Sequence, residues 1–299
     1  AVGPARGAGR RAATPGEHTR MMSRRAWLGL AALPRPVAAQ GGLEALFAPR
    51  ARLWPRWSGH DEAATHSVDH APWTGFLRRY RRPGADGIAR VDYAGVTPAD
   101  RQALEAWLSG LAATRVTALR RDEQFCFWVN LYNGLTMRTV LHAPGVASIR
   151  DINLSGGIFL RGPWDAQVVT VEGEALTLND IEHRILRPIW REPRVHYVVN
   201  CASLGCPDLP EEALTPARRE AMLAAAARAY VAHPRGVTVR PDGLLLSAIY
   251  NWFAADFEPD GGVVPHLLRH AGPAQAAAIR TAPGIAGYAY DWALNRAAG

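Results

Sequence analysis

Residues 194–207 read RVHYVVNCASLGCP, a β-prone apolar run that ends in two of the three cysteines of this 299-residue chain. The run from Val195 to Asn200 predicts a buried strand, and the Gly and Pro beside the cysteines predict a turn directly after it. Side chains that follow a buried strand in this way are commonly presented to a cleft. We therefore expect a site around Cys201 and Cys206.

Helical patterns and short hairpins alternate through the rest of the chain. The predicted helices cover residues 74–81, 97–113, 122–142, 177–187, 215–233, 247–257 and 264–270, and the predicted hairpins cover 167–177 and 237–247. Thr97 and Thr177 each begin a capping box, and Pro188 is expected to end the helix before it. Because no βαβ periodicity is present, we predict an α+β fold, with several helices packed around a small, largely antiparallel sheet in a single compact domain.

The first 39 residues differ from the remainder in composition. Residues 23–28, SRRAWL, resemble a twin-arginine export signal, and a short apolar run and the small residues 37–39, VAA, follow it. We expect a leader over 1–39, made of an upstream extension and a signal peptide starting at Met21 or Met22. An irregular segment over 40–72 and a domain over 73–299 would follow. The protein is then periplasmic or otherwise exported; an ordinary basic tail is the alternative.

Most of the net positive charge of the chain lies in the expected leader. Residues 1–39 hold seven Arg and one Glu, so the remainder has 27 basic and 26 acidic residues, about +1 instead of +7. The basic composition is therefore poor evidence for a nucleic-acid partner, and none is expected. The chain contains no Lys and no Gly-rich phosphate loop, so no cofactor is expected. No apolar run reaches the ~20 residues of a membrane span, so none is expected in the mature chain.

Several motifs, taken together and in order, resemble the domain-of-unknown-function 547 (DUF547) family. They are FWVNLYN (127–133), LNDIEH (178–183) with ILRP (185–188), PRVH (193–196), NCAS (200–203) with GCP (205–207), LS (246–247) with Trp252, Asp256 and Phe257, and YDWALN (290–295). The resemblance covers roughly residues 75–296. It implies no agreed activity, although the family is often discussed as a relative of thiol hydrolases. Cys126 departs from the family pattern, so we do not expect it to act.

Three polar residues fall on apolar helical faces. Asn130 and Asn133 lie on the buried stripe of helix 122–142, where an unpaired amide would cost about 1–3 kcal/mol. They either tie loops to the helix, or one of them orients a catalytic group or donates to an oxyanion. Glu182 shares a face with Ile181 and Ile185, so it should be buried and partnered. It is either part of a structural ion pair or an orienting or acid–base carboxylate.

His183 and His196 are the two candidates for a catalytic base. Either could instead be a hydrogen-bonded structural residue. Alternation along the predicted strand places His196 and Asn200 on the face opposite to Cys201, so His183 is the better candidate unless a bulge reverses the alternation. The two cysteines leave three alternatives: a disulfide across a short loop, a nucleophilic Cys201, or a metal site. The C-x₄-C spacing is atypical of zinc, so no metal is expected.

The leading hypothesis is thiol-dependent amide or acyl hydrolysis or transfer. Cys201 would be the nucleophile, His183 the base and Glu182 its orienting group, with Asn130 or Asn200 supporting the oxyanion. The binding residues would be Asn133, His196, Asn200, Ser203 and Cys206, around an unidentified small-molecule or peptide ligand. The alternative is a non-catalytic periplasmic binding or scaffolding module with a structural Cys201–Cys206 disulfide.

Overall fold

A computed structural model describes residues 48–154 and 162–298, so the expected leader lies outside the described residues. All described residues belong to one unit, Val37–Gly299. The α-helices are α2 (Ala71–Tyr80), α3 (Pro98–Ala112), α4 (Arg121–Leu141), α5 (Arg187–Trp190), α6 (Arg219–Ala232), α7 (Ile249–Trp252), α8 (Val263–His270) and α9 (Pro273–Thr281). The 3₁₀ helices are η2 (Pro55–Ser58), η3 (Val116–Ala118), η4 (Ile149–Asp151), η6 (Pro193–Tyr197) and η7 (Ala254–Asp260), and η5 (Asp180–Leu186) is a π-helix.

The strands form three small sheets. Two are antiparallel hairpins, β1 (Arg81–Pro83) with β2 (Ala89–Val91) and β3 (Gln167–Val171) with β4 (Glu174–Thr177). In the third, β5 (Val237–Arg240) pairs antiparallel with β6 (Gly243–Ser247), and β7 (Ile285–Ala289) pairs parallel with β6. The α+β prediction and both predicted hairpins are confirmed, whereas β1, β2 and β7 were not predicted.

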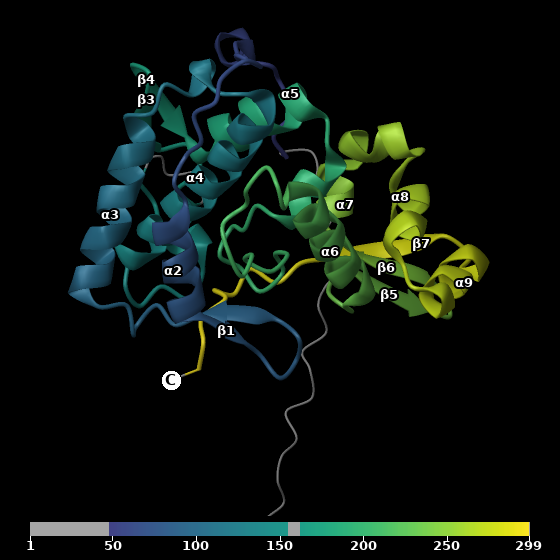
Figure 1. Cartoon of the computed structure of the whole chain (residues 1–299). Coiled ribbons are helices and arrows are strands. Elements are labelled where there is room, and N and C mark those ends of the chain that lie inside the picture. The colour runs from purple at the N-terminus through teal and green to yellow at the C-terminus, as the bar shows by residue number, and fades with distance from the viewer. Residues whose placement is uncertain (1–47, 155–161, 299) are drawn as a thin grey trace, which may run out of the picture. The chain divides into compact units, whose positions relative to one another are not determined.

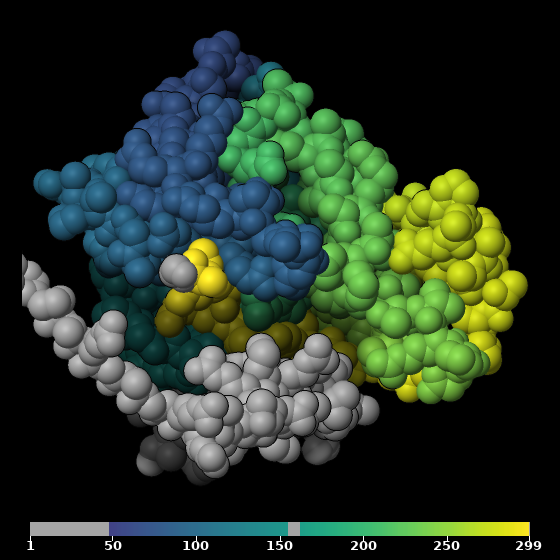
Figure 2. Space-filling view, turned by 90° about the horizontal axis from the view of Figure 1, so that it is seen from below, coloured from purple at the N-terminus to yellow at the C-terminus, as the bar shows by residue number. Residues whose placement is uncertain are grey.

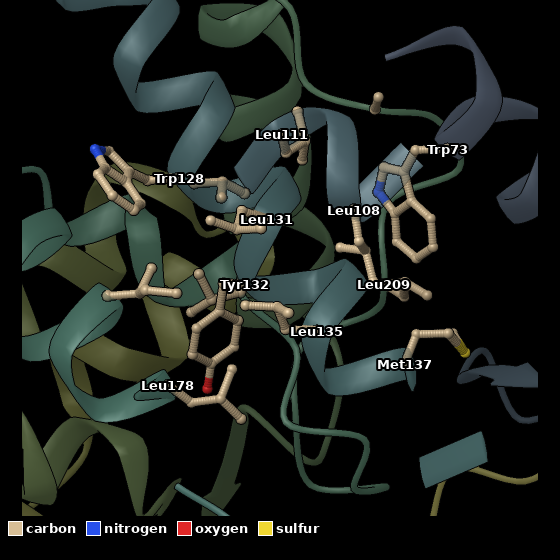
Figure 3. Close-up of a cluster of buried hydrophobic side chains, with 14 of the residues drawn as sticks. Trp73, Leu108, Leu111, Trp128, Leu131, Tyr132, Leu135, Met137, Leu178 and Leu209 are labelled. Carbon is tan, nitrogen blue, oxygen red and sulfur yellow. The ribbon is translucent and has the colours of Figure 1, made fainter. Parts of the chain in front are cut away.

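Helix α4 is the centre of the larger of two hydrophobic cores. Its sequence is apolar on nearly all sides, and 18 of its 21 residues are buried. Figure 3 shows side chains of α4 packed between α3 and Leu178, with the hydroxyl of Tyr132 directed toward Leu178. Gly134 permits the close approach of α3, because a Cβ there would lie 2.5 Å from the ring of Trp107.

The second core is formed by β5, β6, α6, α7, α8 and α9, which lie together in Figure 1. The apolar run of residues 194–207 lies between the two cores. Val195, Val198 and Val199 pack into the core around α4, whereas Tyr197 packs into the second core. The run therefore joins the two halves of the fold.

The strand predicted over Val195–Asn200 is wrong. The structure has η6 there, followed by irregular backbone. Pro193 stands in the first turn of η6, and Glu192 caps it by accepting from the N–H of Arg194. Because both cores bury the run, it is as apolar as a central strand would be, and composition alone cannot separate the two. The alternation argument that favoured His183 fails with the strand.

The helix predicted from Thr177 also differs from expectation at its end. Its capping box is confirmed, since the N–H groups of Thr177 and Asp180 each donate to the other's side chain. Pro188 does not end the helix, which continues as α5. The turn before it is widened, with the N–H of Arg187 donating to Glu182 O, so the α-helical bonding is already interrupted where proline would have broken it.

The segment after β7 crosses from the second core to the first. The N–H groups of Leu204 and Gly205 donate to the carbonyls of Ala293 and Asp291, each at 2.8 Å. Gly205 is required there, because a Cβ would lie 2.8 Å from the backbone nitrogen of Asp291. Figure 2 shows the yellow end of the described chain against blue N-terminal segments, where Ala297 N donates to Val91 O. No helix in the described ranges is long and apolar enough to cross a membrane.

Candidate functional site

A cavity of about 450 Å³ lies between residues of the two cores. Tyr132 and Glu182 line it from the side of α4, and Trp252 and Tyr290 line it from the side of the second core. Its size is within the range of small-molecule sites. Two clusters of polar and reactive side chains lie at the cavity. We call them the thiol wall (Cys201, Cys206 and Tyr290, with Ser203 behind them) and the imidazole wall (Glu182, His183 and His196, with Arg187 and Asp256 behind them).

The thiol wall brings two free thiols into contact. The Sγ atoms of Cys201 and Cys206 are 2.6 Å apart, and Cys201 is half-buried while Cys206 is 4% exposed. The hydroxyl of Tyr290 lies 3.1 Å from the sulfur of Cys201 and donates to that of Cys206 at 3.2 Å. Ser203 Oγ lies 3.2 Å from the sulfur of Cys201 and 2.9 Å from the Tyr290 hydroxyl. Both sulfurs therefore belong to one hydrogen-bonded network.

The negative charge of this pair belongs on Cys206. Burial opposes ionisation there, but hydrogen bonds from the Cys201 thiol and the Tyr290 hydroxyl outweigh it and lower the pKa of Cys206 to about 6. The backbone N–H of Cys201 adds a fixed donor at 3.0 Å. The bond to Cys206, together with burial, raises the pKa of Cys201 well above its usual value. The pair thus carries one proton and one charge near neutral pH.

Two asparagines fix the backbone around the thiols. Asn133 donates to Val198 O at 2.8 Å and accepts from the N–H of Asn200 at 2.9 Å. Asn200 in turn donates to Pro207 O at 2.7 Å and accepts from the N–H of Ala202 at 2.8 Å. Ala202 has a φ of +61°, a strained conformation for a residue with a Cβ. These bonds hold the turn between the cysteines.

The imidazole wall is organised around an ion pair between the buried Arg187 and the partly buried Asp256. Arg187 Nε donates to Asp256 Oδ2 at 2.5 Å, and His196 Nε2 donates to the same oxygen at 2.8 Å. Burial of Asp256 opposes its ionisation, yet the bonds from His196 and Arg187 hold its pKa well below the usual range. The ring of Phe253 stacks on His196 with centroids 4.5 Å apart. Asp256 therefore fixes both the ring and the tautomer of His196.

Both histidines are neutral and differ in what they can do. Burial lowers the pKa of His183 and of His196. His183 Nδ1 accepts from Arg187 Nη1 at 2.9 Å, which leaves its Nε2 as a donor. His196 uses Nε2 on Asp256, which leaves Nδ1 as an acceptor, 3.8 Å from Glu182 Oε1. Of the two, His196 has the arrangement of a base.

Glu182 is buried and partnered, as its helical phase predicted. It is 7% exposed, and burial raises its pKa to about 7. Its partners are the hydroxyl of Tyr132, by a hydrogen bond, and the Nδ1 atoms of His183 and His196, at 3.9 and 3.8 Å. Within the described residues it forms no ion pair with an arginine. Near neutral pH this carboxyl can therefore both give and take a proton.

Some expected site residues do not line the cavity. Asn130 is 1% exposed, and its amide bonds both backbone groups of Leu214, at 2.9 and 3.0 Å. Asn133, Asn200 and Ser203 are also absent from the lining that the described residues form. The amides of Asn130 and Asn200 are thus engaged with backbone, which removes them as oxyanion donors. No hydrogen bond joins either histidine to either sulfur in the described parts of the chain.

Four residues in or beside the two walls were missed as site residues: Arg187, Asp256 and Tyr290 of the walls, and Tyr132, which bonds Glu182. Each lies within a motif quoted for the family resemblance, and that is the one signal that could have selected them. Local pattern could not, because Tyr290 reaches the cavity, and Asp256 reaches His196, from segments far along the chain. No group of three His, Cys, Asp or Glu among the described residues is arranged to hold a metal ion.

Comparison with known proteins supports the motif analysis. Residues 116–231 match the family described as "Protein of unknown function, DUF547", so the resemblance is confirmed over that stretch. The matched segment includes both cysteines of the thiol wall, and Glu182, His183 and His196 of the imidazole wall. Asp256 and Tyr290 lie beyond it. No curated protein and no solved structure matches the chain.

Proposed function

We propose that this DUF547 protein carries out thiol-dependent acyl or amide hydrolysis or transfer on a small-molecule or peptide ligand bound in the cavity. The observation that carries the proposal is the set of hydrogen bonds to the Cys206 sulfur, from Cys201 N–H, the Cys201 thiol and Tyr290, which favours a thiolate at neutral pH. A preformed thiolate needs no base in contact with it. The lack of a bond from a histidine to sulfur is then consistent with the chemistry.

In this proposal the nucleophile is Cys206, and Cys201 holds the proton of the pair. The sulfur of Cys206 attacks the acyl carbon, a C–S bond forms and the bond to the leaving group breaks. Glu182, protonated in part near neutral pH, supplies the proton that the leaving amine or alkoxide needs. Water then attacks the thioester and gives its proton to His196 Nδ1, the acid is released, and that proton returns to Glu182.

The second candidate is a non-catalytic binding or scaffolding module in which the cysteines form a structural disulfide. The contact of the two sulfurs at 2.6 Å favours it. Against it, a cross-link over so short a loop adds only ~2 kcal/mol of stability by loop entropy. A count of free thiols in protein isolated from the compartment where it resides separates the two candidates.

The decisive experiment measures iodoacetamide alkylation from pH 5 to pH 9, with peptide mapping. We expect labelling at Cys206 with a midpoint near pH 6, an upward shift of that midpoint in Cys201→Ser, and its loss in Cys206→Ser. Cys126→Ser is the matched control, because Cys126 is fully buried and burial raises its pKa well above the usual value, so it should change nothing. Absence of labelling below pH 8 in the wild-type protein would reject the thiolate.

Catalysis needs its own test. Activated ester and amide probes should acylate Cys206 and turn over, and Glu182→Gln should slow turnover more than it slows alkylation. If alkylation is normal but no probe from a broad panel acylates Cys206, the acyl-transfer proposal is wrong.

The proposal includes export, which concerns residues outside the described ranges. Mature protein should begin near Gln40, and replacing Arg24 and Arg25 by Lys should retain the precursor in the cytoplasm. An uncleaved N-terminus at Met21 or Met22 in fractionated cells would remove the periplasmic location.

A further inference from the structure

We infer that Cys201 and Cys206 form a reversible dithiol–disulfide couple that exchanges with low-molecular-weight disulfides entering the cavity. This is a second activity of the thiol wall, and it does not require the acyl transfer proposed above. Three features carry it: the contact of the two sulfurs, the rigidity of the turn between them, and the place of the pair inside the cavity.

The first feature is the spacing of the reduced thiols. Their sulfurs are 2.6 Å apart, and each is also within 3.2 Å of the Tyr290 hydroxyl. A disulfide bond is about 2.05 Å long, so oxidation needs only a small side-chain movement. The fold therefore holds both cysteines near disulfide geometry while they are still thiols.

The second feature is the turn itself, which is fixed by bonds that do not involve sulfur. Asn200 bonds the backbone at both ends of the turn, through Ala202 N–H and Pro207 O. The C-terminal segment bonds the middle, through Leu204 and Gly205. Since these bonds keep the turn in place without a cross-link, we expect oxidised and reduced protein to share one backbone structure. A disulfide that served only to hold the turn would be redundant with these hydrogen bonds.

The third feature limits the substrate. Cys206 is 4% exposed and lines the cavity. Beside it lies a cluster of three aromatic rings, Trp252, Tyr290 and Trp292, each in contact with the other two at centroid distances of 4.7 to 5.5 Å. A disulfide on the surface of a folded protein cannot approach a sulfur so placed. The cavity has a volume of about 450 Å³ and an aromatic lining, so it fits a small disulfide with apolar substituents.

The exchange balances in two steps. The thiolate of Cys206 attacks one sulfur of the disulfide RSSR; a mixed disulfide forms and RS⁻ leaves, taking the proton of the Cys201 thiol. The Cys201 thiolate then attacks the Cys206 sulfur, the protein disulfide forms and the second RS⁻ leaves. One protein thiolate and one protein thiol are oxidised to the disulfide, and one RSSR is reduced to RSH and RS⁻, so protons, charge and electrons balance. In reverse, small thiols reduce the protein disulfide.

The test uses the full chain and hydroxyethyl disulfide with 2-mercaptoethanol, at ratios that span reducing to oxidising. After acid quenching and alkylation, mass mapping should show that the free thiols of Cys201 and Cys206 disappear together at a single disulfide-to-thiol ratio. The midpoint should be the same whether the protein starts reduced or oxidised. Cys126 should remain free throughout as the internal control. A pair that stays reduced at every ratio, or that stays oxidised once formed, overturns the inference.

Single-cysteine variants resolve the steps. Cys201→Ser should stop at a mixed disulfide on Cys206, and Cys206→Ser should react at least tenfold more slowly, because Cys201 alone lacks the fixed backbone donor. A mixed disulfide that persists in the wild-type protein would contradict the second step. Exchange without acylation by the ester and amide probes rejects only the acyl-transfer proposal, and acylation without exchange rejects only this inference.

Discussion

The two walls of the cavity stabilise buried charge by different means. In the thiol wall, a single negative charge rests on sulfur and is surrounded by neutral donors, namely a thiol, a hydroxyl and a backbone N–H. In the imidazole wall, the charge of Asp256 is met by the full positive charge of Arg187. Neutral donors can be removed one at a time with graded effects, whereas removing one member of a buried ion pair leaves the other uncompensated.

The walls also differ in the hydrogen bonds that hold their residues in place. The thiol wall depends on amide bonds from Asn133 and Asn200 to backbone, and the imidazole wall depends on side chains that bond each other. Mutations should therefore affect the imidazole wall mainly through stability and its dependence on pH, and the thiol wall mainly through thiol reactivity.

The largest effect is expected from Asp256→Asn. The guanidinium of Arg187, only 3% exposed, would lose its counter-charge, so the free energy of unfolding should fall by about 3–5 kcal/mol. Urea unfolding at pH 7 measures this. The matched control is Glu211→Gln, which removes an ion pair with Arg81 whose carboxylate is 81% exposed and which should change stability by about 0–1 kcal/mol. Equal losses in the two variants would contradict the distinction drawn for the imidazole wall.

Glu182→Gln should change how stability depends on pH. The pKa of Glu182 rises from 4.5 to about 7 on folding, so between these values the folded protein holds a proton that the unfolded chain has lost. Wild-type stability therefore falls as pH rises through this window, by about 3 kcal/mol for a shift of this size. The variant should match the wild type at pH 4 and exceed it at pH 8. Unfolding curves from pH 4 to pH 8 measure the difference, and parallel pH profiles would show that Glu182 ionises normally.

Asn133→Ala should weaken the attachment of the thiol wall to α4. It leaves Val198 C=O and Asn200 N–H buried without their partner, at a cost of about 2 kcal/mol. We also expect faster hydrogen exchange at Asn200, which distinguishes a local loosening from a general loss of stability. Gln102→Ala, at an exposed position of α3, is the control and should leave both measurements unchanged.

Tyr290→Phe should have the smallest effect on stability and a clear one on chemistry. Losing one hydrogen bond to the thiolate should raise the pKa of Cys206 by about one unit, ~1.4 kcal/mol. The midpoint of the alkylation profile reports this directly. Tyr288→Phe, two residues earlier in β7, is the matched control, since no described hydrogen bond joins Tyr288 to a sulfur. An unchanged midpoint in Tyr290→Phe would mean that the thiol and the backbone N–H of Cys201 stabilise the thiolate without the hydroxyl.

Much of the local structure could be predicted from sequence. Thr97 and Thr177 cap helices as expected, because capping depends on residues three apart in the chain. The expected reciprocal bond at Thr97 is replaced by a tertiary one, since the N–H of Thr97 donates to the Tyr80 hydroxyl. The burial of Glu182 followed from helical phase alone. Such features need only neighbours within one turn.

The errors arose where two cores meet. Residues 195–199 are buried from both sides, and nothing in their composition separates a 3₁₀ turn between two cores from a strand within a sheet. The pairing of His196 with Asp256 spans 60 residues and that of Cys201 with Tyr290 spans 89, so neither leaves a local pattern. Polar residues at a cleft could be found from sequence, but which of them face each other could not.

The crossing of the segment after β7 sets the order in which the site can be assembled during synthesis. Ala293 O and Asp291 O hold the turn between the cysteines, and Tyr290 supplies the hydroxyl that bonds both sulfurs. A nascent chain therefore makes both thiols about ninety residues before the groups that organise them leave the ribosome. Until then Cys206 lacks the Tyr290 hydroxyl and the turn lacks the carbonyls that hold it, so the complete donor set around the thiolate appears only when translation of this region is finished.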